Sequence, residues 1–327
     1  MLTINIMGGL GNQLFQIFTA IATALRNNDT FFFLKYESLG GNPGHKRYTY
    51  WDTLFKGLHK YLQPLDEKAQ QETEALPSWQ ERGFHFTPVP TNTREFTTKP
   101  LRLTGYFQNE KYFKDKYDDI CQMIGLSEQR QMIAELYKNE PWFRHFNGEC
   151  SSKNGVLIAM HFRIGDYTMN PHYHPLINNE YYYRCISHII TKTSAAAAAA
   201  AAADSAPAPV AYSFLVFYDP CDKSKVEQIV TQLKTRCECD ANYPAYNKDI
   251  QFFFVPDTIP EWQQMLLMSL CDHNIIPNST FSWWGAYFNP NPTKIVCYPS
   301  IWFGPALFHY DTSDLCLKTW DKINASP

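Results

Sequence analysis

The stretch IQFFFVPDTIPEWQQMLLMSLCDHNIIPNSTFSWWGAYF, residues 250–288, alternates two kinds of segment. The runs IQFFFV and NII have the length and composition of buried strands, whereas EWQQMLLMSLC and STFSWWGAYF read as helices. Short apolar strands that alternate with helices are typical of a parallel sheet covered by helices on both faces. The stretch therefore predicts an α/β fold.

The same alternation extends away from this stretch in both directions. We predict further strands at residues 155–162, 212–218 and 294–298 and further helices at residues 179–190 and 223–235. A shorter series at the start of the chain predicts strands at Leu2–Ile6, Thr30–Leu34 and Leu101–Thr104 and a helix at Asn12–Arg26. The two series predict two domains, 1–150 and 151–327, with their boundary near the polar segment at 147–155.

Residues 194–209, SAAAAAAAAADSAPAP, interrupt the second series. Alanine favours helix, but the Pro-Ala-Pro that follows cannot continue one. We therefore expect a low-complexity surface insertion at these positions.

Composition narrows the classes of function. The 327 residues carry a formal net charge of −3, which argues against nucleic acid as the main partner, because tracking phosphates needs a basic excess. No uninterrupted apolar run of about 18 residues is present, so we predict no membrane span. Asn12, Gln13 and Gln16 interrupt the first apolar stretch, which argues against a signal peptide. Nine scattered cysteines suit free thiols, and we expect a cytoplasmic protein.

The segment HFRIGDY, residues 161–167, ends the strand that begins at residue 155. In an open parallel sheet, ligands bind outside the carboxyl ends of the strands. His161 and Arg163 are two positions apart, so in extended backbone their side chains share one face. The planar guanidinium suits bidentate contact with phosphate, and Asp166 supplies a carboxylate close by. A structural Arg–Asp pair beside a buried histidine is the alternative.

A second candidate site lies at Asn278, Ser279, Thr280 and Phe281, between the strand NII and the following helix. Serine and threonine at this point can cap the helix. The same position directs free backbone N–H groups and hydroxyls at the carboxyl edge of the sheet, where the helix dipole favours an anion. Both interpretations remain open from the residues alone. Trp283 and Trp284, within the helix, are expected to serve packing.

Three glycines, Gly8, Gly9 and Gly11, stand beside Asn12 and Gln13 in the turn between the first strand and the first helix. The turn lacks the third glycine of the dinucleotide fingerprint and the Lys-Ser/Thr of a P-loop. A tight packing turn and a turn that lets a ligand approach the backbone are both compatible with this pattern.

The sequence offers little for a metal ion to bind. It contains no D-x-D and no acidic cluster at metal-ligand spacing, and the single C-x-C, Cys237 and Cys239, has no second ligand pair nearby. We therefore expect neither a metal nor another cofactor.

Four segments, GGLGNQLFQ, GYFQNEKYF, HFRIGDY and NSTFSWWGAYFN, occur in this order between residues 8 and 289. Together they resemble the successive motifs of the α-1,2-fucosyltransferases, glycosyltransferase family 11. The resemblance implies a GT-B-like fold, with two Rossmann-like domains whose parallel sheets face each other across a cleft. It also implies a metal-independent, inverting enzyme whose partners are a nucleotide-sugar donor, GDP-fucose, and a glycan acceptor, commonly at O2 of a galactose.

The resemblance also implies roles for individual residues. Arg163 would bind the β-phosphate, and His161 would line the nucleotide pocket. The diphosphate would lie against the turn made of Asn278, Ser279, Thr280 and Phe281. In the other domain, the glycine-rich turn after the first strand would face the transferred sugar and the acceptor. Its residues at this position are Gly9, Gly11, Asn12 and Gln13.

An inverting transfer also needs a group that takes the proton of the acceptor hydroxyl. The candidates are Asp166, followed by His172 and His174 in the segment NPHYHP, also facing the acceptor. A proline-rich surface turn is an equally good interpretation of the two histidines.

Two positions depart from the family pattern. Ile164 stands where many members have a second arginine, and Gln264 stands where an acidic residue is usual. A carboxylate at position 264 would accept hydrogen bonds from two N–H groups of guanine, whereas glutamine has one acceptor oxygen. A transferase for a different nucleotide sugar therefore stays open, as does an inactive sugar-binding protein.

Overall fold

The computed structural model describes residues 1–40, 47–90, 100–143, 155–200, 210–246 and 249–326. The chain forms two compact units. Unit 1 contains residues 1–131 and 309–317, and unit 2 contains residues 132–308 and 318–327. The division falls within helix α5 (Leu126–Tyr137), before the boundary predicted near residues 147–155, most of which lie outside the described residues.

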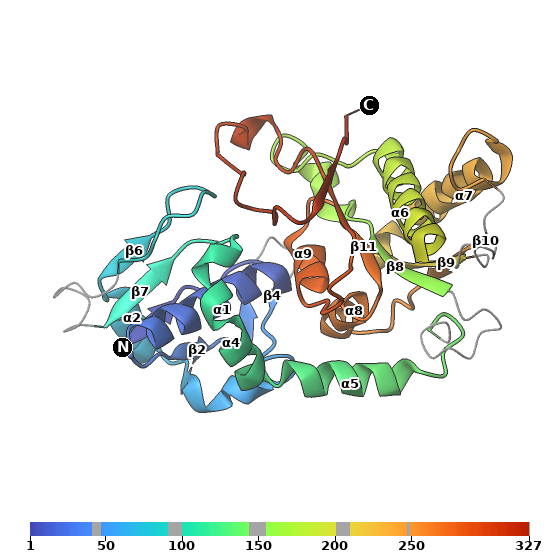
Figure 1. Ribbon diagram of the computed structural model, residues 1–327. Helices are drawn as coiled ribbons and strands as arrows, with labels where there is room; N and C mark the ends of the chain where they lie inside the picture. Colours follow the sequence, from blue (N-terminus) through green and yellow to red (C-terminus); the bar gives the residue numbers. More distant parts are fainter. Residues whose placement is uncertain (41–46, 91–99, 144–154, 201–209, 247–248, 327) are drawn as a thin grey trace. The chain divides into compact units, whose positions relative to one another are not determined.

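Unit 2 is built on a sheet of six parallel strands in the order β10-β9-β8-β11-β12-β13 (Figure 1). The strands are β8 (Gly155–His161), β9 (Ala211–Phe217), β10 (Asp249–Phe254), β11 (His273–Ile275), β12 (Val296–Pro299) and β13 (Asp321–Ile323). The predicted parallel α/β sheet is confirmed. β13 was not predicted, because its three residues carry no distinct apolar pattern.

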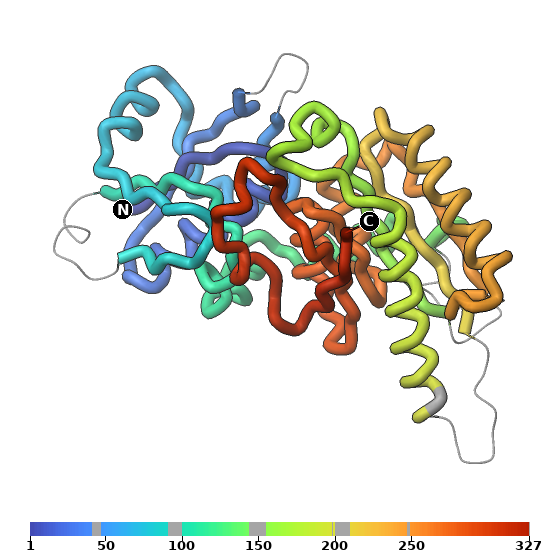
Figure 2. The backbone as a smooth tube through the Cα atoms, turned by 90° about the horizontal axis from the view of Figure 1, so that it is seen from above, coloured from blue at the N-terminus to red at the C-terminus, as the bar shows by residue number. Residues whose placement is uncertain are grey.

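The α-helices that connect these strands are α6 (Asn179–Ala200), α7 (Lys223–Cys239), α8 (Glu261–Met268) and α9 (Thr280–Tyr287). α6 and α7 run side by side, and α8 packs on α9 (Figures 1 and 2). α6 continues through the first alanines of the predicted insertion to Ala200, and residues 201–209 lie outside the described residues.

The strand order reverses between β8 and β11. From β8 the chain moves outward through β9 to β10 at one edge of the sheet, and then returns to β11 on the other side of β8. Met160 at the end of β8 pairs with Ile275 at the end of β11. The segments that follow these two strands therefore leave the sheet at neighbouring points, which is where open α/β sheets bind their ligands.

The contact between α8 and α9 fixes the start of α9 against the sheet. Trp283 and Trp284 of α9 are fully buried, which confirms their predicted packing role, and the ring of Trp283 stacks on that of Tyr287 at 4.7 Å. The two helices approach closely at Gly285, where a Cβ atom would lie only 2.8 Å from Cβ of Met268.

Unit 1 has a smaller parallel sheet in the order β1-β7-β6, made of β1 (Leu2–Ile4), β7 (Leu101–Thr104) and β6 (Ser78–Gln80). A second parallel pair consists of β2 (Phe33–Lys35) and β5 (Leu62–Pro64), and Phe31, just before β2, forms a bridge with Leu2 of β1. β3 (Ser38–Leu39) and β4 (Arg47–Tyr48) form a short antiparallel pair.

The helices of unit 1 are α1 (Leu10–Arg26), α2 (Glu67–Glu74) and α4 (Tyr117–Ile124), beside the first part of α5. α1 is buried along most of its length, so that its first turn is held firmly behind β1. Within the described ranges of both units, no helix has the length and apolar character that a membrane crossing requires.

Candidate active site

The segment HFRIGDY leaves the carboxyl end of β8 and folds into a short 3₁₀ turn, Gly165–Met169. Nη2 of Arg163 lies 2.9 Å from both carboxylate oxygens of Asp166, and the guanidinium stands 5.6 Å from the centre of the Tyr167 ring. Burial opposes the charge of Arg163, but Asp166 and Tyr167 outweigh this, so the pKa of Arg163 lies above its usual value. A fixed cation therefore stands at this edge of the sheet.

Two contacts from outside the segment hold it in place. The N–H group of Gly165 donates to Oδ2 of the buried Asp222 at 2.8 Å. The hydroxyl of Tyr167 donates to the backbone carbonyl of Asn278 at 2.8 Å. The second contact joins the segment after β8 directly to the turn after β11. The structure therefore brings the two predicted parts of the donor site together.

The turn after β11 ends at Ser279, which occupies the N-cap position of α9 in extended backbone. Its side chain makes no capping hydrogen bond, unlike the capping role considered from the sequence. The first N–H groups of a helix have no partner within the helix. Those of α9, which begins at Thr280, are thus available to an anion.

His161 is the last residue of β8 and is 6% exposed. Burial, together with the neighbouring charge of Arg163, lowers its pKa to about 3, so the imidazole is neutral near neutral pH. Its Nδ1 atom is buried and has no hydrogen-bond partner among the described residues. The ring lies 5.5 Å from that of Phe281, at the start of α9. Both predicted nucleotide-binding residues thus meet at the strand switch.

The side chain of Asn278 holds two further segments, at Pro175 and Trp302, near the carboxyl end of β11. Its Nδ2 donates to the carbonyl groups of Pro175 and Trp302, at 3.0 Å in each case. Its Oδ1 is buried and has no hydrogen-bond partner in the part of the chain that the structure describes. Asn278 therefore organises the turns of the site through its amide nitrogen.

The two predicted acceptor-facing histidines differ in environment. His174 is half-buried and stacks on Tyr167 at 4.7 Å, and desolvation lowers its pKa. His172 is exposed, and its carbonyl accepts from the N–H group of Ala306 at 2.9 Å. His174 thus belongs to the Arg163 segment, whereas His172 lies at its rim.

Gln264 lies in the first turns of α8, which follows the edge strand β10. Its Nε2 donates to the carbonyl of Ile259 at 2.8 Å, back across the start of its own helix. β9 and β8 separate β10 from β11 in the sheet. Gln264 lies in a helix that packs on α9, the helix that follows the turn at Asn278.

In unit 1, the turn predicted to face a sugar follows β1 and opens α1 at Gly9. Gly8 has φ +76°, a conformation that favours glycine, and a Cβ there would lie 2.5 Å from Nδ2 of Asn12. Gln13 was predicted to face a sugar, but it is buried and its Nε2 donates to the carbonyl groups of Gly8 and Tyr48 at 3.1 and 2.8 Å. Gly11 is buried as well. Gly9 and Asn12 keep partial exposure.

The segment GYFQNEKYF, residues 105–113, follows β7 and meets this turn. Nε2 of Gln108 donates to Oδ1 of Asn12 at 3.0 Å. Glu81, which follows β6, accepts from the N–H groups of Tyr106 and Phe107 at 2.8 and 2.7 Å. All three strands of the small sheet therefore send polar groups to one edge.

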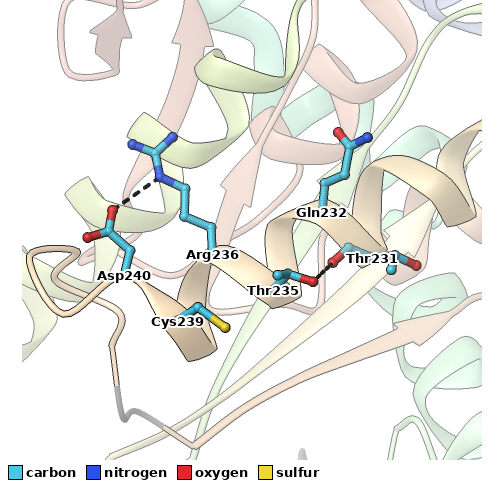
Figure 3. A pocket seen from close by; sticks show the side chains of 6 residues that line it. All are labelled: Thr231, Gln232, Thr235, Arg236, Cys239 and Asp240. Atoms are coloured by element: carbon cyan, nitrogen blue, oxygen red, sulfur yellow. Dashed lines mark hydrogen bonds and ion pairs between the residues drawn. The ribbon is translucent and has the colours of Figure 1, made fainter.

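The hollow drawn in Figure 3 lies along the second half of α7. Six residues of α7 and its end line it: Thr231, Gln232, Thr235, Arg236, Cys239 and Asp240. Arg236 is held by Glu180 at 2.9 Å and by Asp240 at 3.6 Å. The lining lies at the end of α7, which leads to the first residues of β10, whereas ligands of an open parallel sheet bind outside the carboxyl ends of its strands. We therefore do not assign the diphosphate to this hollow. Within the described ranges, no group of three His, Cys, Asp or Glu side chains is arranged to hold a metal ion.

Comparison with known proteins agrees with this arrangement. Residues 231–324, which include Gln264 and the turn at Asn278, match the model of Glycosyl transferase family 11. The O-antigen biosynthesis glycosyltransferase WbnK of Escherichia coli is 29% identical over 228 residues, which are 68% of this chain and 60% of that protein. The alpha-1,2-colitosyltransferase of Escherichia coli is 23% identical over 97% of this chain and 96% of its own length. These matches support the resemblance to glycosyltransferase family 11.

The matches confirm the resemblance drawn from the four motifs and support a glycosyltransferase. Among solved structures, Arabidopsis thaliana FUT1 in complex with GDP is similar over 91% of this chain and 70% of that chain, with 12% identity and a TM-score of 0.44. The fold assignment rests instead on the two units themselves, whose parallel sheets agree with the predicted GT-B-like class.

Sequence reasoning missed three residues that shape the candidate sites: Asp222, Tyr167 and Glu81. Each holds a loop through a backbone group far away in the chain, at residues 165, 278 and 106–107 respectively. A side chain with such a partner has no local spacing pattern. Tyr167 alone could have been singled out, because it lies within a motif.

The lowered pKa of His161 predicts a pH dependence of stability. The unfolded chain takes up a proton at this residue near pH 6.5, whereas the folded chain does so only near pH 3. The corresponding stability is present above pH 6.5 and is lost as the pH falls toward 3, by about 2 kcal/mol between pH 7 and pH 5. We expect His161→Asn to remove this dependence, measured by urea unfolding of the full chain.

The exposed His172 provides the matched control, and His172→Asn should leave the acid sensitivity of the wild type in place. An equal loss of stability between pH 7 and pH 5 in the wild type and in His161→Asn would contradict the assignment.

Proposed function

We propose that this chain is an inverting α-1,2-fucosyltransferase that transfers L-fucose from GDP-fucose to a sugar hydroxyl, O2 of a galactoside, without a metal ion. Unit 2 provides the donor half of the site and unit 1 the acceptor half. The observation that carries the proposal is the hydrogen bond from Tyr167 to the carbonyl of Asn278, which joins the Arg163 segment to the turn before α9 at the strand switch of unit 2.

This arrangement suits the departure of a nucleoside diphosphate. In an inverting transfer the acceptor oxygen forms a bond to the anomeric carbon while the bond from that carbon to the β-phosphate oxygen breaks. Negative charge then develops on the diphosphate. Arg163 and the first N–H groups of α9 are preorganised donors for that charge. Ser279 and Thr280 add hydroxyl groups at the same place.

The remaining residues of unit 2 take supporting roles. Asp166 holds the guanidinium of Arg163 through a 2.9 Å contact, which makes it a positioning residue. His161 is neutral and presents an unsatisfied nitrogen beside Phe281, in keeping with a nucleotide pocket. His174 is also kept neutral by its lowered pKa, so it is able to accept a proton from the acceptor. His172 lies at the rim and contacts a longer acceptor.

The glycine-rich turn of unit 1 contributes amide groups. Gly8 and Gly9 allow a sugar to approach the backbone, and Asn12 presents its Nδ2 group as a donor to a sugar hydroxyl. Its Oδ1 is already used by Gln108. A neutral sugar acceptor can be bound by such amide groups through hydrogen bonds alone.

A second donor is favoured by one observation. The relative that matches almost the full length of this chain is named an alpha-1,2-colitosyltransferase. Colitose is L-fucose without its 3-hydroxyl group, so the same diphosphate site serves either sugar. Gln264, in place of an acidic residue, also leaves the base of the donor open. The second candidate function is thus colitosyl transfer from a nucleotide sugar.

A donor panel tests the proposal. We expect release of GDP from GDP-fucose in the presence of a β-galactoside, with an α-1,2 linkage in the product and with turnover unchanged by EDTA. GDP-colitose, UDP-galactose and dTDP-rhamnose provide the comparison, and product linkage is read by NMR. Transfer from GDP-colitose alone would establish the second candidate. Loss of turnover on chelation, restored by Mn²⁺ or Mg²⁺, would contradict the metal-independent mechanism.

Arg163→Ala is expected to lower kcat at least about a hundredfold, about 3 kcal/mol, because a donor to the developing charge is lost. Arg163→Lys should restore little, since a point charge does not replace the planar fork. Arg236→Ala, which removes a cation from the α7 hollow of the same unit, should leave kcat near the wild-type value. Near-normal turnover of Arg163→Ala would show that the segment HFRIGDY has only a structural role.

Gln264→Glu tests the base of the donor. A carboxylate cannot donate to the carbonyl of Ile259, so the side chain is released from that bond and can accept two guanine N–H groups. If the donor carries guanine, GDP should bind about tenfold more tightly, about 1.4 kcal/mol. Calorimetric titration with GDP, UDP and dTDP measures the change. Gln251→Glu, at an exposed position of β10, is the matched control, and no change for any nucleotide would place Gln264 outside the pocket.

A further inference from the structure

We propose that Glu81 is a positioning residue for the acceptor: its carboxylate holds the turn after β7 and thereby fixes Gln108 and Asn12 at the sugar-facing edge of unit 1. No motif contains Glu81, and it lies far beyond Asn12 in the sequence. The inference deepens the proposed function and rests on it for the activity measurements. Its structural basis is a set of contacts within unit 1 alone.

The contacts of Glu81 point to the holding of a loop. Its own N–H group donates to the carbonyl of Thr104 at 2.9 Å, which places it directly beside the end of β7. Its Oε2 accepts from the N–H groups of Tyr106 and Phe107 at 2.8 and 2.7 Å. Two short bonds from consecutive amides to one carboxylate oxygen are charge-assisted and directional. The turn is therefore fastened at its two central residues.

The turn needs such a fastening because its backbone is unusual. Phe107 has φ +54°, in the left-handed region that bulky side chains seldom adopt. At Gly105 a Cβ atom would lie 2.5 Å from Cβ of Glu81 and 2.7 Å from its Oε2, so only glycine lets the carboxylate come this close. Strained backbone persists where the surroundings over-determine it, and such positions cluster at functional sites.

The strained turn places Gln108 within hydrogen-bonding distance of Asn12. Gln108 is 6% exposed, and its Nε2 donates to Oδ1 of Asn12 at 3.0 Å. A second amide, Nε2 of Gln16 in α1, donates to the carbonyl of Gly105 at 3.1 Å and fixes the other end of the turn. With Oδ1 of Asn12 engaged, its Nδ2 is oriented as the donor for a sugar hydroxyl. The sequence of contacts runs from Glu81 through the backbone to Gln108 and Asn12.

Keeping Glu81 ionised in its buried position lowers the stability of the folded chain. Burial raises its pKa to about 7 despite the two backbone N–H bonds, and Tyr112 is the titratable group beside it. Burial, with the carboxylate next to it, raises the pKa of Tyr112 as well, so the phenol stays protonated. The folded chain binds the Glu81 proton more tightly than the unfolded chain, so this contribution to stability falls as the pH rises from 4.5 through 7.

Glu81→Gln removes the charge and preserves the shape. At pH 8 we expect kcat/KM for the acceptor to fall about tenfold, because neutral hydrogen bonds hold the turn less firmly. We expect the midpoint of thermal unfolding to stay level or rise, and GDP affinity, which belongs to unit 2, to stay within about twofold of the wild type. The acidic limb of the wild-type kcat/KM profile near pH 7 should disappear. Glu72→Gln, at an exposed position of α2, is the matched control and should change none of these values.

A double-mutant cycle tests the connection to Asn12. If Glu81 acts through Asn12, the loss of acceptor kcat/KM in Glu81→Gln combined with Asn12→Ala should be about that of Asn12→Ala alone. Losses that multiply would overturn the proposed connection. An unchanged acceptor kcat/KM in Glu81→Gln, or a loss accompanied by weaker GDP binding and a lower unfolding midpoint, would overturn the positioning role.

One measurement separates this proposal from the proposed function. Amide hydrogen exchange at Tyr106 and Phe107 requires no donor and no acceptor, and we expect it to be at least about tenfold faster in Glu81→Gln than in the wild type at pH 8. Unchanged exchange would overturn the role of Glu81 even in an active fucosyltransferase. Faster exchange in a chain that transfers no sugar would contradict the proposed function and leave the holding of the turn established.

Discussion

The parallel pairing of β8 with β11 is the constraint on which the candidate site of unit 2 depends. The chain reaches β11 only after it has gone out to β10 and returned, yet the sheet pairs Met160 at the end of β8 with Ile275 at the end of β11. Because the two strands end together, the Arg163 segment and the N-terminus of α9 leave the sheet as neighbours. The hydrogen bond from Tyr167 to the carbonyl of Asn278 follows from that placement.

Both units hold their loops in the same way. In unit 2 the buried carboxylate of Asp222 accepts the N–H group of Gly165, and a Cβ at that glycine would lie 3.3 Å from the same oxygen. In unit 1 the buried carboxylate of Glu81 accepts two N–H groups of the turn that begins at Gly105. In each case a glycine makes room for a carboxylate that holds the backbone.

Much of the fold could be predicted from sequence because its signals are local. The strands and helices of unit 2 follow from apolar runs and helical spacing, and the motif at Arg163 stands out because a cation follows a buried strand. Gln13 shows where such reasoning fails. Its place in a glycine-rich turn indicated a sugar contact, whereas its amide bonds to the carbonyls of Gly8 and Tyr48. The second of these partners lies 35 residues away, which no local pattern reveals.

The sequence by itself determined the α/β class, the order of the elements and the family, because hydrophobic periodicity and short motifs are properties of neighbouring residues. Only the tertiary structure decided which side chains serve the site and which serve the scaffold. Asp222, Glu81 and the side chain of Asn278 acquire their roles from backbone groups that the sheets bring to them. A hydrogen bond depends on distance in space, and the strand order, not the spacing along the chain, sets that distance.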